Sequence, residues 1–269
     1  MSGPVDDEIA VNGVRLHFRF EGPDGAPVVA LVNSLGTDLA MWEPQIPALT
    51  RRYRVLRHDT RGHGRSAAPP APYAMGALAD DVLGLVSHVG AERFHVVGIS
   101  LGGLEALAVA LRQPRGLAGI AICDSRIDVP PEGTLAIDER VRLVREQGMK
   151  PLADAMIQRW FTAATLAARP AYIDAVHRML LGTSVEGFAG CAAAIRDSGL
   201  SARVAALRLP MLFLVGDQDV ALPVALMQQV QSQVPGAQSA IIQGAGHLSN
   251  LERPEAFNEA LLAFLDQMA

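Results

Sequence analysis

Residues 93–106 read Arg93-Phe94-His95-Val96-Val97-Gly98-Ile99-Ser100-Leu101-Gly102-Gly103-Leu104-Glu105-Ala106. An apolar, β-branched run reaches Gly98, and helix formers begin at Gly102, so the stretch predicts a buried strand that turns sharply into a helix. Ser100 stands at the apex, where a strained backbone requires small neighbours on both sides. The N-terminus of the helix points at Ser100 and favours a developing negative charge there. Because the Gly-x-Ser-x-Gly pattern lies between a strand and a helix, it predicts that Ser100 is a nucleophile.

The composition is that of a globular protein. The 269 residues suffice for one α/β domain with an insertion, and the net charge of −5 argues against nucleic acid or an anionic membrane as a partner. The two cysteines, Cys123 and Cys191, are far apart in the sequence and are expected to be reduced and buried. No apolar run is long enough to span a bilayer, and the acidic first residues do not form a signal peptide. We therefore expect a cytoplasmic location.

Strands and helices alternate on both sides of Ser100. Expected strands cover residues 9–20 (a hairpin turned by Asn12-Gly13), 27–32, 53–59, 94–99, 117–123, 210–215 and 237–242, and expected helices cover 76–89, 101–113, 224–234 and a segment from about 254. Wholly apolar strands such as 27–32 are typical of strands that are buried on both faces. The alternation predicts an α/β fold with a mostly parallel, doubly wound sheet.

The pattern changes between residues 126 and 200, where only helical periodicity occurs. The expected helices cover 137–146, 152–161, 171–181 and 185–197. The alternation of strand and helix then returns. The sequence therefore predicts a core made of residues 1–125 and 201–269, with residues 126–200 inserted as a helical cap.

A serine hydroxyl is a poor nucleophile at neutral pH and needs a general base, which in turn needs an orienting acid. Asp219 follows one expected strand, and His247 lies in a glycine-rich loop after the next. The chain order Ser100, Asp219, His247 is the order of the catalytic triad in α/β hydrolases. Asp217, in the same turn, and Asp124, which also follows a strand, are alternatives to Asp219.

The oxyanion of such a reaction needs two backbone donors. We expect the N–H groups of Leu101, next to the nucleophile, and of Leu35, in the turn after strand 27–32. Trp42 and Trp160 are candidates to line the substrate pocket, although packing in the core is the commoner role of a tryptophan. The histidines form no cluster with metal-ligand spacing, so no metal is expected. The loop 61–65 lacks the Walker spacing of a phosphate loop, so we expect it to be structural.

The chain resembles the α/β-hydrolase superfamily along nearly its whole length and, within it, the 3-oxoadipate enol-lactonases. The closer resemblance is carried by Asn33-Ser34-Leu35-Gly36-Thr37-Asp38, Met41-Trp42, Asp59-Thr60-Arg61-Gly62-His63-Gly64, Gly148-Met149, Arg159-Trp160-Phe161-Thr162 and His247-Leu248-Ser249-Asn250-Leu251-Glu252. Two positions depart from the lactonase pattern. Ile137 stands where these enzymes often have a tryptophan, and Cys123-Asp124-Ser125-Arg126 replaces an Asn-Thr-Ala-like turn. Both lie where the cap meets the predicted site, so they bear on the substrate.

The resemblance implies a cofactor-free serine hydrolase that opens an anionic enol-lactone to 3-oxoadipate in aromatic catabolism. The substrate carboxylate would require a cation, and Arg126, Arg140 and Arg159 are the candidates in the cap. The alternatives are a generalist carboxylesterase and a ligand-binding sensor with slow turnover, and haloperoxidase-like activity is also compatible with the triad. A dehalogenase with an aspartyl nucleophile is excluded, because position 100 is serine. A small lactone or ester is the expected partner, and the sequence is compatible with a monomer or a homodimer.

Overall fold

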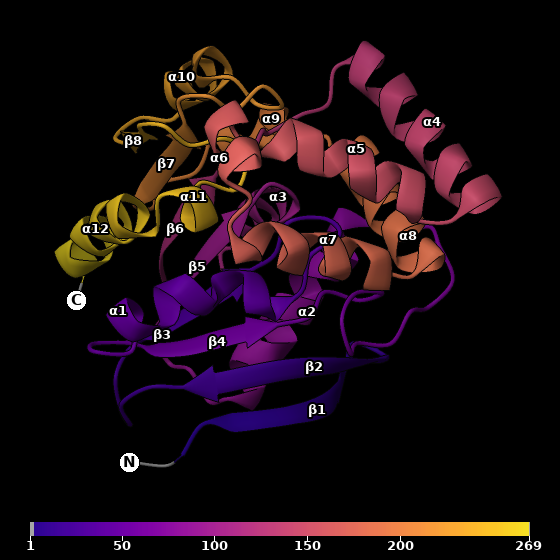
Figure 1. The fold of residues 1–269 in the computed structure, drawn as a ribbon. Helices are drawn as coiled ribbons and strands as arrows, with labels where there is room; N and C mark the ends of the chain where they lie inside the picture. The colour runs from indigo at the N-terminus through magenta and orange to yellow at the C-terminus, as the bar shows by residue number, and fades with distance from the viewer. Residues whose placement is uncertain (1–2, 269) are drawn as a thin grey trace.

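The computed structural model describes residues 3–268. An eight-stranded sheet runs through the molecule, with helices on both of its faces (Figure 1). The strands are β1 (Val5–Val11), β2 (Val14–Glu21), β3 (Val28–Val32), β4 (Arg54–His58), β5 (Phe94–Ile99), β6 (Leu117–Cys123), β7 (Met211–Gly216) and β8 (Gln238–Ile242). Their order is β1-β2-β4-β3-β5-β6-β7-β8, and only the β1–β2 and β2–β4 pairs are antiparallel. This arrangement confirms the predicted mostly parallel, doubly wound sheet.

The N-terminal hairpin is longer than the sequence pattern indicates. Asn12 and Gly13 both have positive φ, 49° and 75°, as a two-residue hairpin turn requires. Strand β1 begins at Val5, which pairs with Phe20, rather than at residue 9. The first residues of β1 are acidic and exposed at the edge of the sheet, so no apolar alternation marks them in the sequence.

Two layers of helices bury the two faces of the sheet. Helices α2 (Met75–His88), α3 (Leu101–Ala110) and α10 (Val224–Gln231) pack on one face, whereas the 3-10 helix η1 (Leu39–Gln45), α1 (Ile46–Leu49) and α12 (Pro254–Leu265) pack on the other. Strand β5 contributes to both layers, because Val96 belongs to the first apolar cluster and Val97 to the second. Burial on both faces explains its wholly apolar sequence.

Between β6 and β7 the described chain forms helices and no strand. These are α4 (Pro131–Gln147), α5 (Lys150–Trp160), α6 (Ala163–Ala168), α7 (Ala171–Gly182), α8 (Val185–Arg196) and the short α9 (Ser201–Val204). Helices α4, α5, α7 and α8 lie together on one side of the molecule (Figure 1). We propose that residues 126–200 form a cap over the core.

Two of these helices differ from the expectation. Helix α4 begins at Pro131 rather than at residue 137, because a proline in the first turn starts the helix before its apolar periodicity does. Helix α6 lies in a segment for which no element is predicted. The Thr162 side chain caps it by accepting a hydrogen bond from the Thr165 N–H, a local signal that periodicity does not contain.

A buried histidine makes the fold sensitive to acid. His95 on β5 is fully buried beside Tyr53, and neither of its ring nitrogens has a partner among the described residues. Burial, together with the nearby positive charge of Arg93, lowers the pKa of His95 to about 4. The unfolded chain therefore binds a proton that the folded chain does not, and stability is lost as the pH falls from about 6.5 towards 4.

We expect His95→Leu to remove this acid sensitivity. Between pH 7.5 and 4.5 the free energy of unfolding should fall by about 2 kcal/mol less in the variant than in the unaltered protein. Urea unfolding at the two pH values measures this difference. His88→Leu, on the exposed end of α2, is the matched control and should leave the difference between the two pH values as it is in the unaltered protein. An acid sensitivity that is equal in His95→Leu and the unaltered protein would contradict the prediction.

Candidate active site

Ser100 lies at the junction of β5 and α3 with φ 56° and ψ −111°. A positive φ is uncommon for a residue with a Cβ, and here it holds the side chain at the tip of the turn. A Cβ on Gly98 would lie 2.0 Å from the backbone oxygen of Gly102, and a Cβ on Gly102 would lie 2.2 Å from that of Val32. Both glycines are therefore needed for the close approach of the turn to the helix and the neighbouring strand.

His247 and Asp219 form a buried pair. Nδ1 of His247 lies 2.8 Å from Oδ2 of Asp219, and the other oxygen of Asp219 accepts hydrogen bonds from the N–H groups of Ala221 and Leu222, at 2.7 and 2.9 Å. The backbone N–H of His247 donates to the carbonyl of Trp160, at 2.7 Å, which joins this loop to the cap. Because Nδ1 faces Asp219, Nε2 is the ring nitrogen left for a nucleophile.

The two members of this pair stabilise each other's charge. Burial alone would raise the pKa of Asp219 and lower that of His247. The opposite charges and the hydrogen bond between them outweigh burial, so the pKa of Asp219 is lowered and that of His247 is raised. The carboxylate can thus orient the imidazole and stabilise an imidazolium.

The other two aspartates considered for this position face different partners. Asp217 accepts hydrogen bonds from the backbone of residues 244–245. Asp124, buried at the end of β6, accepts from the N–H of Gly216 at 2.8 Å and from Oγ of Ser249 at 2.5 Å. Of the three carboxylates, only that of Asp219 contacts the histidine among the described residues.

Two backbone donors are free beside Ser100. The N–H groups of Leu35 and Leu101 have no acceptor within residues 3–268. The next N–H after Leu35, that of Gly36, donates to Nε2 of His63 at 2.9 Å. Burial lowers the pKa of His63, which keeps the ring neutral and Nε2 able to accept this bond. The sequence pattern placed His63 in a structural loop but did not indicate its contact with the turn that carries the predicted oxyanion donor Leu35.

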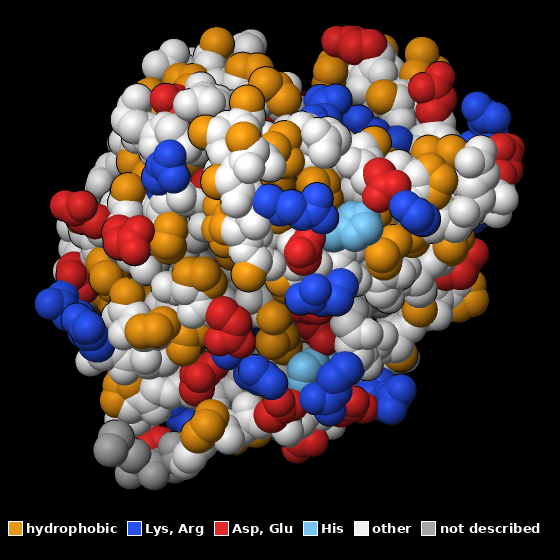
Figure 2. Space-filling view, in the orientation of Figure 1, with side chains coloured by type: hydrophobic (Ala, Val, Ile, Leu, Met, Phe, Trp, Pro, Cys, Tyr) orange, Lys and Arg blue, Asp and Glu red, His pale blue; other side chains and the backbone are white. Residues whose placement is uncertain are grey.

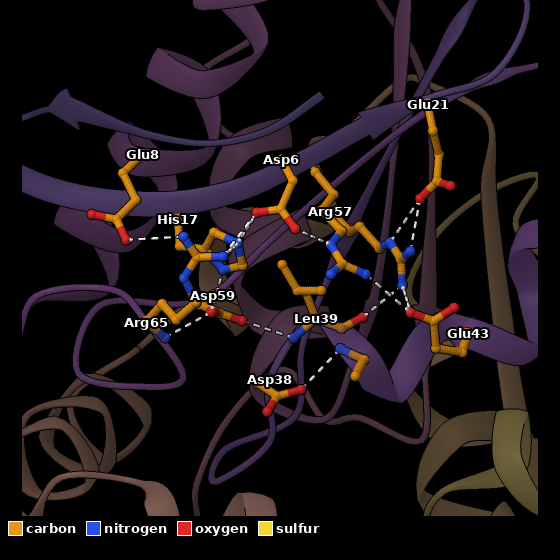
Figure 3. Close-up of polar contacts among 12 residues, drawn as sticks. Asp6, Glu8, His17, Glu21, Asp38, Leu39, Glu43, Arg57, Asp59 and Arg65 are labelled. Atoms are coloured by element: carbon orange, nitrogen blue, oxygen red, sulfur yellow. Dashed lines mark hydrogen bonds and ion pairs between the residues drawn. The ribbon is translucent and has the colours of Figure 1, made fainter. Parts of the chain in front are cut away.

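A polar network contacts Leu39, which lies a few residues after the turn that carries Leu35 (Figure 3). Asp59 accepts hydrogen bonds from the N–H groups of Leu39 and Arg65, at 2.9 and 2.8 Å, and lies 2.7 Å from Nδ1 of His17. Nε2 of His17 lies 2.9 Å from Asp6 on β1. The network joins the N-terminal hairpin to the loop after β4 and to the start of η1, a few residues after the turn that carries Leu35.

A cavity of about 360 Å³ is lined by Ser100 and His247. Leu35 and several cap residues complete its lining, among them Arg126, Ile137, Arg140, Arg159 and Trp160. The three arginines suggested by the sequence thus line the same cavity as the predicted nucleophile, and the cap gives this cavity positive charge. Ile137, one of the two departures from the lactonase pattern, lines the same cavity.

The two tryptophans occupy different environments. Trp160 lines the cavity, with its ring centroid 5.7 Å from that of His247. Trp42 does not line it, so this candidate for substrate binding is wrong. Its side chain is fully buried in the apolar cluster under α12, and its Nε1 donates to Oδ1 of Asn33 at 3.0 Å. Trp42 therefore contacts the segment Asn33-Ser34-Leu35-Gly36, which carries the predicted oxyanion donor Leu35.

The titratable side chains, the cysteines and the helices of the described chain have three further features. Residues 3–268 contain no group of three or more His, Cys, Asp or Glu side chains placed to hold a metal ion. Cys123 and Cys191 are buried and form no disulfide with each other. None of the described helices is both long and apolar enough to cross a membrane.

A serine on a strand–helix turn, a buried Asp–His pair on two later loops and free N–H donors beside the serine, all on a doubly wound sheet, define an α/β hydrolase. The chain belongs to the alpha/beta hydrolase family, whose model matches residues 24–260. It is accordingly a hydrolase.

Two enol-lactonases and an esterase are among the known proteins that the chain is similar to. The chain is 31% identical to 3-oxoadipate enol-lactonase 2 of Acinetobacter baylyi over 96% of both chains. It is 36% identical to the enol-lactonase of Burkholderia xenovorans, whose crystal structure superposes with a TM-score of 0.92 over 97% of this chain and 100% of the other. A thermophilic esterase from Thermogutta terrifontis, solved with malate bound, is 31% identical to the chain. Its structure also superposes with a TM-score of 0.92, over 98% of this chain and 99% of the other.

Proposed function

We propose that the protein is a serine hydrolase that opens a small anionic lactone, with 3-oxoadipate enol-lactone as the first candidate. In this reaction Ser100 Oγ bonds to the lactone carbonyl carbon while His247 takes its proton. The oxyanion is held by the N–H groups of Leu35 and Leu101. The ring C–O bond then breaks, the enol oxygen receives the proton, and water releases the acid from the acyl-enzyme.

The observation that carries the substrate class is the charge of the cavity. Arg126, Arg140 and Arg159 line it together with Ser100, and its lining contains no Asp or Glu. Guanidinium groups bind carboxylates through paired hydrogen bonds, and an enol-lactone of this kind bears one carboxylate. The relatives named enol-lactonases support the same substrate, and the esterase solved with malate, an anion, fits a positively charged site.

The test is steady-state hydrolysis of 3-oxoadipate enol-lactone beside p-nitrophenyl butyrate, an ester without a carboxylate. We expect kcat/KM for the lactone to exceed that for the ester by at least about 10²-fold, because only the lactone engages the arginines. Ester turnover with a negligible lactone rate would contradict the lactonase assignment and leave the hydrolase. Product formation that stops after one equivalent would favour a sensor.

A generalist carboxylesterase is the second candidate. It is favoured by the two departures from the lactonase pattern, since Ile137 lines the cavity and Arg126 ends the changed turn. The similarity to the Thermogutta terrifontis esterase supports it as well. Comparable kcat/KM values for lactone and ester would select this candidate.

A further inference from the structure

The cavity over Ser100 holds more positive charge than one carboxylate neutralises. Within residues 3–268, none of the three guanidinium groups of Arg126, Arg140 and Arg159 forms an ion pair or a hydrogen bond with another side chain. Other basic side chains of the cap do form ion pairs: Arg142 with Glu146, Lys150 with Asp154, Arg169 with Asp174 and Arg196 with Asp138. The cavity arginines thus differ from the paired arginines on the outer surface of the cap.

The positive charges of half-buried Arg126 and Arg140 and of exposed Arg159 repel one another in this cavity. Lys and Arg side chains gather in the hollow beside α4 (Figure 2). Burial lowers the pKa of Arg126, and the charges of Arg159 and Arg140 lower it further. Burial and the charge of Arg159 lower the pKa of Arg140 in the same way. Such an arrangement is unfavourable by itself and is stabilised by anions that enter the cavity.

The arginines lie at two levels relative to the predicted triad. Arg126 follows Ser125, whose Oγ donates a hydrogen bond to the carbonyl of Ser100 at 2.6 Å. Arg159 precedes Trp160, whose ring centroid lies 5.7 Å from that of His247. Arg140 lines the same cavity from α4, a helix that packs against α5 and α8. The cavity therefore has an inner positive region beside the reacting groups and an outer one on α4.

We propose that the cavity binds two carboxylates at once, an inner one between Arg126 and Arg159 and an outer one at Arg140. The proposal rests on the proposed function in taking Ser100 as the reacting group, and it extends the substrate class to acyl derivatives of dicarboxylic acids. An enol-lactone brings one carboxylate. Ring opening creates the second at the carbon that Ser100 attacked, so the dicarboxylate product matches the cavity better than the lactone does.

The test uses two acids of equal chain length as inhibitors of p-nitrophenyl butyrate hydrolysis. At constant ionic strength, adipate should compete with a Ki at least about ten-fold lower than that of hexanoate, because only adipate reaches both regions. Calorimetric titration of each acid gives the same comparison without turnover. Equal affinities for adipate and hexanoate would overturn the proposal.

Arg140→Gln separates the two subsites. It should raise the Ki of adipate about ten-fold and leave that of hexanoate unchanged. Arg145→Gln, an exposed arginine on the same helix that does not line the cavity, is the matched control. If Arg140→Gln weakens neither acid, or both equally, the outer subsite is wrong. A protein that fails to turn over the lactone and still prefers adipate would contradict the proposed function alone.

Discussion

Replacing Ser100 with alanine is expected to lower kcat/KM for lactone and ester at least about 10³-fold. In the proposed mechanism the Ser100 hydroxyl supplies the attacking oxygen, and neither His247 nor the two proposed oxyanion donors can replace it. The variant should remain folded, because alanine and serine both carry a Cβ and the substitution adds no atom at φ 56°. Steady-state kinetics together with a thermal unfolding curve measures the two effects.

Binding separates this catalytic loss from damage to the cavity. Ser100→Ala should bind adipate as tightly as the unaltered protein, because the arginines are untouched. Ser87→Ala, exposed on α2, is the control and should keep full activity. Activity of Ser100→Ala within ten-fold of the unaltered protein would remove Ser100 from the mechanism.

Asp219→Asn is expected to lower kcat about 10³ to 10⁴-fold, since an amide holds the wrong tautomer of the histidine. Asp124→Asn is expected to cost far less, because Asp124 contacts Gly216 and Ser249 and an asparagine can both accept and donate there. A larger loss in Asp124→Asn than in Asp219→Asn would reverse the assignment of the triad acid.

The dependence of kcat/KM on pH tests the influence of Asp124 on His247. Burial and the charge of Asp219 raise the pKa of Asp124 to about 7, so above this pH it is mostly ionised. Its negative charge is one of the influences that raise the pKa of His247. Asp124→Asn removes this charge, which lowers the pKa of His247 and leaves the base neutral at lower pH. The acid limb of kcat/KM should therefore move to lower pH in this variant.

Much of the fold follows from local sequence patterns. The apolar run before Ser100 and the small residues after it define the strand, the turn and the helix, because the spacing of apolar residues depends only on near neighbours along the chain. The spacing of apolar residues did not predict the segments that lack an apolar stripe. The start of β1 is polar because it lies at an edge, and the first turn of α4 depends on Pro131.

The sequence by itself determined the class of the protein, since the order of Ser100, Asp219 and His247, which follow β5, β7 and β8, is a property of the chain. Only the tertiary structure decided which aspartate faces the histidine and which tryptophan lines the cavity, where Trp160 lies and Trp42 does not. It also decided that three arginines from separate segments of the cap converge over Ser100. Side-chain direction at such positions is set by contacts between distant segments, whereas secondary-structure periodicity fixes only the face of an element.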